Sequence, residues 1–203
     1  MNNYEDFLNF ATGLNKIYTV DFVRNFKLRV GKRILSNKLR QFKRNRETHN
    51  FETAKTAGIL FTPSDQLSFE EIKHFLSYLS HYKLQIYVLG FIDAKIIPES
   101  FLFWKGINLF SRKELNWAMV PTSPVVTDFI DKPFDLLLDL SLTDSFPIEY
   151  ITRLSKSKFK VGRFTNAHTS LDLMFDIQNE KKLESYLGHI KNYLNLINQK
   201  SSA

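Results

Sequence analysis

Residues 134–140 read Phe134-Asp135-Leu136-Leu137-Leu138-Asp139-Leu140, and this stretch decides the fold class. A short apolar run of this kind is typical of a strand that is buried on both faces of a parallel sheet. A helix is predicted next, over residues 147–156, because Ile148, Ile151 and Leu154 recur at helical spacing. Residues 159–163 form the following apolar run. A strand, a helix and a strand in this order predict two parallel strands joined by a crossover.

The same order occurs earlier in the chain. Residues 58–61 are predicted to form a strand, residues 67–82 a helix with Ser68 as its N-cap, and residues 84–91 a second strand. Together, the two units predict an α/β fold, a Rossmann-like layered domain with a mostly parallel sheet and helices on both faces.

Four further elements complete the prediction. A short strand is expected at residues 107–110, a short helix at 123–130, an edge strand at 171–177 and a C-terminal helix at 180–198. Leu187, Ile190 and Leu194 lie on one face of this last helix, and we expect them to be buried against the sheet.

The positive charge of the chain is concentrated at its N-terminal end. Residues 1–50 contain 11 Lys or Arg and 4 Asp or Glu, whereas residues 51–203 contain 17 of each kind. Apolar residues at helical spacing predict an amphipathic helix over about residues 19–45, which Gly31 bends or breaks, and residues 43–50 look like a linker. The chain is therefore divided into a basic helical arm with its linker, residues 1–50, and an α/β domain, residues 51–203. Ten cations and no acid occur between positions 24 and 46: Arg24, Lys27, Arg29, Lys32, Arg33, Lys38, Arg40, Lys43, Arg44 and Arg46.

This run of cations has two interpretations. One is a solvated face on a helix whose other side packs on the domain. The other, which leads our functional hypothesis, is an arm that binds RNA, ribosomal RNA included, because unpaired cations repel one another unless a counter-charge is bound. We expect contact with phosphates, since the segment offers few amides suited to reading bases. An anionic membrane surface and an acidic protein are less favoured partners.

The composition excludes several classes of chemistry. The chain has no Cys, so thiolate metal sites, iron–sulfur clusters and cysteine nucleophiles are excluded. With only 7 Gly and neither a G-x-G-x-x-G motif nor a P-loop, a glycine cradle for phosphates is not expected. No catalytic motif or metal-ligand spacing is found, which favours a non-enzymatic binding protein that needs no cofactor. No stretch is long enough to span a membrane, and we expect a cytoplasmic location.

A ligand site at the sheet is the alternative function. In open α/β sheets, ligands bind at the carboxyl ends of the strands. The residues there suit a small nucleotide- or sugar-binding domain or enzyme, although aspartates also commonly cap helices. Trp104 and Trp117 belong to an aromatic middle segment that either fills the core or stacks on a base or sugar. The candidate ligand-binding residues are Ser64, Asp93, Asp139, Ser141 and Asp144.

Several strings also resemble those of an uncharacterised family of Bacteroidota hypothetical proteins. They are Gly90-Phe91-Ile92-Asp93, Phe110-Ser111-Arg112-Lys113-Glu114-Leu115-Asn116-Trp117, Phe134–Ser141 and Lys158–Gly162. The resemblance covers about residues 56–197 and implies a domain of unknown function, with no catalytic residues to transfer. A weaker, fold-level resemblance links residues 134–162 to one Rossmann-like half of heptosyltransferase-like glycosyltransferases. Those enzymes need a second such half, for which this chain has no room.

Overall fold

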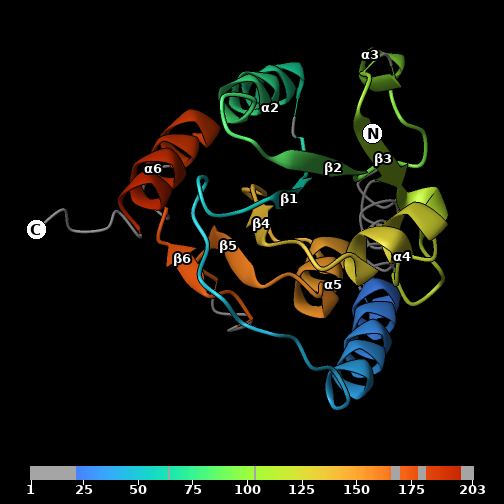
Figure 1. Ribbon diagram of the computed structural model, residues 1–203. Helices are drawn as coiled ribbons and strands as arrows, with labels where there is room; N and C mark the ends of the chain where they lie inside the picture. The colour runs from blue at the N-terminus through green and yellow to red at the C-terminus, as the bar shows by residue number, and fades with distance from the viewer. Residues whose placement is uncertain (1–21, 64, 103, 166–169, 178–181, 198–203) are drawn as a thin grey trace, which may run out of the picture.

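A single parallel sheet of six strands organises the protein (Figure 1), in a computed structural model that describes residues 22–63, 65–102, 104–165, 170–177 and 182–197. The strand order is β3-β2-β1-β4-β5-β6. All neighbouring strands pair in parallel. The strands are β1 (Thr56–Phe61), β2 (Gln85–Ile92), β3 (Ile107–Ser111), β4 (Leu136–Asp139), β5 (Phe159–Arg163) and β6 (Leu173–Phe175). The predicted Rossmann-like α/β fold is confirmed.

The apolar run that decided the fold class forms a central strand. β4 pairs with β1 on one side and β5 on the other, so that Ile59 lies opposite Leu138. The chain winds outward in one direction from β1 to β3 and in the other from β4 to β6. The order reverses between β1 and β4, which is the arrangement of dinucleotide-binding Rossmann sheets. The carboxyl ends of these two strands therefore flank a crevice.

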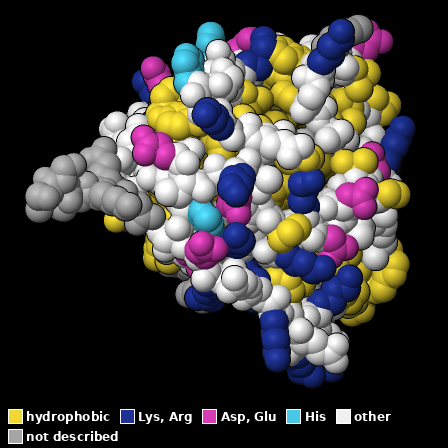
Figure 2. Space-filling model, in the orientation of Figure 1, with side chains coloured by type: hydrophobic (Ala, Val, Ile, Leu, Met, Phe, Trp, Pro, Cys, Tyr) yellow, Lys and Arg dark blue, Asp and Glu magenta, His cyan; other side chains and the backbone are white. Residues whose placement is uncertain are grey.

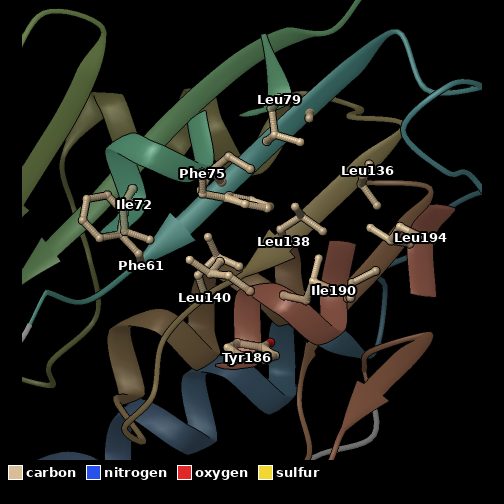
Figure 3. Close-up of a cluster of buried hydrophobic side chains, with 14 of the residues drawn as sticks. Phe61, Ile72, Phe75, Leu79, Leu136, Leu138, Leu140, Tyr186, Ile190 and Leu194 are labelled. Atoms are coloured by element: carbon tan, nitrogen blue, oxygen red, sulfur yellow. The ribbon is translucent and has the colours of Figure 1, made fainter. Parts of the chain in front are cut away.

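Helices cover both faces of the sheet (Figure 1). On one face, α2 and α6 pack against Ile59, Leu136 and Leu138, and Figure 3 shows Phe75, Ile190 and neighbouring side chains meeting there. On the other face, α4 and α5 pack against Leu60, Leu89 and Leu137. The helices are α1 (residues 22–39), α2 (Gln66–Leu79), α3 (Glu99–Leu102), α4 (Pro124–Asp131), α5 (Phe146–Leu154) and α6 (Leu183–Leu196), with a short 3-10 turn at Arg112–Glu114.

Burial of Leu187, Ile190 and Leu194 in the core confirms the prediction for α6. The N-cap prediction for α2 was wrong, because Asp65 is the cap and accepts a hydrogen bond from the backbone N–H of Ser68 at 2.8 Å. No helix among the described ranges is both long and apolar enough to cross a membrane.

The basic helix α1 lies outside the two layers of helices that cover the sheet. Its Leu35 is buried in a small cluster with Phe146 and Tyr150 of α5 and with Ala118. We expected Gly31 to bend or break the helix, but it does not break it, since α1 is continuous from residue 22 to 39. Instead it allows a close approach: a Cβ at this position would lie 2.3 Å from the carbonyl oxygen of Ala118. Glycine is thus required here by packing.

The segment after α1 is not the linker that its sequence indicated, and the helix ends at residue 39 instead of 45. Arg44 forms an ion pair with Asp172 at 2.6 Å and donates to the backbone carbonyls of Ser157 and Lys158. His49 and Asn50 are buried as well. These contacts fasten the segment to the amino ends of β5 and β6, because long-range pairing overrides the polar character of residues 40–50.

Candidate ligand-binding site

A cavity of about 970 Å³ opens at the carboxyl edge of the sheet. Residues that follow four different strands line it, among them Thr62 after β1, Asp93 after β2, Ser141 after β4 and Thr165 after β5. The reversal of strand order between β1 and β4 separates the connections at this edge and so creates the opening. Its volume lies in the upper part of the range, roughly 300–1,000 Å³, that is usual for small-ligand sites.

The cavity unites residues that the sequence had assigned to two different sites. Four of the five predicted ligand-binding residues line it: Asp93, Asp139, Ser141 and Asp144. The fifth, Ser64, lies outside the described residues. Three cations of the predicted RNA-binding helix line the same cavity, namely Arg24, Lys27 and Lys32 on one side of α1. The helix is therefore one wall of the candidate site.

The other predicted cations point elsewhere. Lys38 lies with its Nζ 5.5 Å from the ring centroid of Tyr150, and Arg46 Nε is 3.8 Å from the Asp172 carboxylate. Arg44 was predicted to be a cation that contacts RNA, but its side chain is only 6% exposed and is paired with Asp172. Four exposed cations remain that have no ion pair with any described residue: Arg29, Arg33, Arg40 and Lys43.

Arginines hold the exposed acids of the cavity. Asp93 accepts a hydrogen bond from Arg112 at 2.6 Å, and Asp144 pairs with Arg163. Glu149 likewise pairs with Arg153 at 3.0 Å. By contrast, the three α1 cations at the cavity have no ion pair or hydrogen bond to a described residue. The wall formed by α1 is therefore uncompensated positive charge.

Asp139, the last residue of β4, lines the floor of the cavity. Burial raises the pKa of its carboxyl, although hydrogen bonds from the backbone N–H of Ser141 at 3.1 Å and the hydroxyl of Thr152 at 3.1 Å oppose the shift. Two hydroxyl oxygens that line the cavity, Thr62 Oγ1 and Ser141 Oγ, are buried without a hydrogen-bond partner among the described residues. Buried polar atoms are normally paired, so these two suit the polar groups of a ligand.

The N-termini of the two helices at this edge, α2 and α5, differ in whether a side chain caps them. The N-terminus of α2 is occupied by the Asp65 carboxylate, which caps it. The N-terminus of α5 lies in the cavity wall, where Ser145 is the N-cap residue but its side chain makes no capping hydrogen bond. The unpaired N–H groups and the dipole of such an end favour a negative group.

Sequence reasoning missed the two arginines of this site, Arg112 and Arg163. Arg112 directly follows β3 and Arg163 is the last residue of β5, so their positions at strand ends were a usable signal. Trp117, for which the sequence left core filling and ligand stacking open, lies at the cavity.

Comparison with known proteins yields one match. No curated protein and no solved structure matches the chain. The model of a family of unknown function, DUF6913, matches residues 27–197 and thus covers most of α1 and every strand of the sheet. The chain therefore belongs to this family of unknown function.

Proposed function

We propose that this protein binds a small phosphorylated ligand, a nucleotide or a sugar phosphate, in the cavity at the carboxyl edge of its sheet. The observation that carries the proposal is the uncompensated positive charge of Arg24, Lys27 and Lys32 on one wall of the cavity. The exposed acids elsewhere in the cavity are paired with arginines and do not neutralise this wall. Cations held close together in a concave site repel one another and attract an anion strongly. Phosphate groups accept several charge-assisted hydrogen bonds and suit this wall.

The cavity floor supports the same class of ligand. The buried hydroxyls of Thr62 and Ser141 and the carboxyl of Asp139 offer hydrogen bonds that match the hydroxyls of a sugar. The uncapped N-terminus of α5 adds a positive dipole to the cations of α1. A phosphorylated sugar, alone or in a nucleotide, satisfies both sets of groups at once.

Two triple variants of α1 test this proposal. The cavity variant carries Arg24→Gln, Lys27→Gln and Lys32→Gln, and the matched control carries Arg29→Gln, Arg33→Gln and Arg40→Gln on the opposite side. Both lose three positive charges from the same segment. Titration calorimetry with ribose 5-phosphate, AMP and pyrophosphate measures their affinities.

The cavity variant should bind at least about tenfold more weakly than the parent, because a hydrogen bond to a charged group contributes roughly 1.5–3 kcal/mol. The control should bind as the parent does. Equal losses in both variants, or no binding of any of the three compounds by the parent, would refute the proposal.

RNA binding by the opposite side of α1 is a second candidate function. Arg29, Arg33, Arg40 and Lys43 are exposed and unpaired among the described residues. Figure 2 shows Lys and Arg side chains gathered at the lower end of the molecule, where α1 ends in Figure 1. Such a surface favours contact with phosphates, and Phe22 and Phe26 nearby offer faces for stacking.

The same two variants separate the candidate functions. If the outer cations bind single-stranded RNA, the control variant loses affinity, and its log-affinity against log-salt slope flattens by roughly 0.7 per lost contact. The cavity variant keeps its affinity for RNA in that case. Arg44 is left unchanged, because its side chain holds the segment after α1 in place. RNA binding that is equal in all three proteins, or absent, would exclude this function.

A further inference from the structure

The two tryptophans of the chain have opposite environments. Trp104 packs edge-on against Phe69 with ring centroids 4.7 Å apart, and the Nζ of Lys73 lies 3.4 Å from its ring centroid. Its indole N–H donates to the carbonyl of Ser100 at 3.0 Å. Trp117 lines the cavity and is 60% exposed, and no described aromatic ring or cation stacks on it. An exposed indole at a cavity is a large apolar surface that is available for contact with a ligand.

The loop that carries Trp117 is held firmly. The Asn116 Oδ1 accepts hydrogen bonds from the backbone N–H groups of Ala118 at 2.9 Å and Val120 at 3.1 Å. Met119 has a φ of 62°, a conformation that costs energy for a residue with a side chain. Ala118 and Val120 are buried beneath the loop. The loop is thus held in one conformation at some cost in stability, while the Trp117 side chain remains exposed.

The same loop contacts the cationic helix. The carbonyl oxygen of Ala118 lies against Gly31 of α1, so the backbones of the two elements touch. Trp117 and the cations Lys27 and Lys32 consequently belong to two walls of one cavity that are docked on each other. An aromatic surface that is fixed before binding loses little entropy when a ring stacks on it.

We infer that the phosphorylated ligand is a nucleotide, whose base stacks on Trp117 while its phosphate meets the cations of α1. This inference rests on the proposed function and names its ligand class. Three chemically distinct regions line the cavity: an aromatic surface, a floor of hydroxyl and carboxyl groups, and a cationic wall. A nucleotide has a matching part for each region, whereas a sugar phosphate leaves the indole uncovered. The cavity volume of about 970 Å³ accommodates the larger ligand.

Intrinsic fluorescence tests the inference, because each tryptophan can be observed alone. The Trp104→Phe variant keeps only Trp117 as a reporter, and the Trp117→Phe variant keeps only Trp104. We expect AMP, GMP, CMP or UMP to change the emission of the Trp104→Phe variant saturably. Ribose 5-phosphate, which has no base, should leave the spectral shape unchanged, and neither probe should alter the Trp117→Phe variant.

Calorimetry supplies the second measurement. Trp117→Ala should weaken nucleotide binding by about 5- to 100-fold, the range that corresponds to stacking of one base on an aromatic side chain. The same variant should bind ribose 5-phosphate as the parent does, and Trp104→Phe should change neither affinity. Thermal unfolding confirms that the variants are folded.

The outcomes distinguish the inference from the proposed function. If ribose 5-phosphate binds as tightly as the nucleotides, or Trp117→Ala weakens both equally, base stacking is wrong and binding of a sugar phosphate still holds. If neither class of compound binds the parent, both are wrong. Saturable emission changes with nucleotides alone, together with a selective loss in Trp117→Ala, would establish the nucleotide.

Discussion

Helices α1 and α6 are both amphipathic, yet the fold holds them in different ways. In α6, Tyr186, Ile190 and Leu194 are fully buried in the main core against the sheet. In α1, Leu35 is buried, but Phe22 and Phe26 are 73% and 54% exposed. The apolar side of α6 therefore meets the sheet, whereas α1 contacts α5 and a loop outside it.

This difference separates a helix that builds the core from a helix that builds a site. Apolar burial against the sheet holds α6 in place. For α1, the burial of Leu35 against α5, a close backbone approach at Gly31 and a buried ion pair at Arg44 supply the attachment together. This attachment leaves one side of α1 to present Lys27 and Lys32 to the cavity.

Removal of the Arg44 side chain should have the largest effect. Arg44→Gln removes the buried partner of Asp172 and leaves only the exposed Arg46 near it, with Nε at 3.8 Å, and the loss of one member of a buried pair costs about 3–5 kcal/mol. Chemical denaturation measures the free energy of unfolding. The adjacent exposed Lys43→Gln is the control and should change stability by less than about 0.5 kcal/mol. Similar effects of the two changes would mean that the ion pair does not fasten α1.

Truncation of an apolar side chain within α6 should have the second-largest effect on stability. Leu194→Ala creates a cavity in the main core and should lower the free energy of unfolding by about 2–5 kcal/mol. Leu196, two residues later on the same helix, is 66% exposed. Leu196→Ala should therefore change stability by less than about 0.5 kcal/mol. A small loss for Leu194→Ala would contradict the view that α6 is held by apolar burial.

The sequence was informative about elements and less so about their assembly. The run at residues 134–140 predicted a buried parallel strand because its apolar pattern is local. The pairing of β1 with β4 joins segments far apart in the chain, and no local pattern encodes it. The placement of Asp93 and Asp139 at one edge followed from the rule that parallel strands end together.

The position of the basic helix relative to that edge could not be predicted. Its docking depends on the absence of a Cβ at Gly31, which in the sequence looked like a helix breaker. The burial of Arg44 depends on Asp172, a partner 128 residues away. Charge density alone made all ten cations look equivalent, whereas tertiary contacts assign them to a cavity wall, an ion pair and an outer surface.

Glycine substitutions compare the two helices directly. Gly31→Ala places a Cβ 2.3 Å from the Ala118 carbonyl oxygen and 2.7 Å from Phe146, so α1 and the Trp117 loop must move apart. We expect an unfolding free energy lower by about 1–3 kcal/mol and weaker ligand binding, measured by denaturation and calorimetry. Gly188→Ala in α6 meets nothing within 4 Å and should stabilise the protein by up to about 1 kcal/mol. Unchanged binding in Gly31→Ala would show that the two walls need not be docked.

The pH dependence of stability should reveal the buried amine of Lys160, which lies beneath the segment that follows α1. Lys160 is fully buried, donates to the carbonyl of Thr152 at 2.7 Å, and lies with its Nζ 5.4 Å from the Phe42 ring centroid. Burial, followed by the charge of Arg44, lowers its pKa to about 7. Between pH 7 and the ordinary lysine value of 10.5, the unfolded chain holds a proton that the folded protein lacks. The free energy of unfolding should therefore rise with pH by up to about 1.4 kcal/mol per unit in this range.

Denaturation of the parent and of Lys160→Met from pH 7 to 9.5 checks this rise, which the variant should lose. The matched control is Lys158→Met, since hydrogen bonds to Asp135 and Glu47 raise the pKa of Lys158 above 10.5. Stability from a raised pKa is complete below the unfolded value, so Lys158→Met should keep the slope of the parent. A slope that persists in Lys160→Met would place the responsible group elsewhere. A slope lost only there would show that the layer under this segment contains a buried titratable amine, in contrast to the apolar contacts under α6.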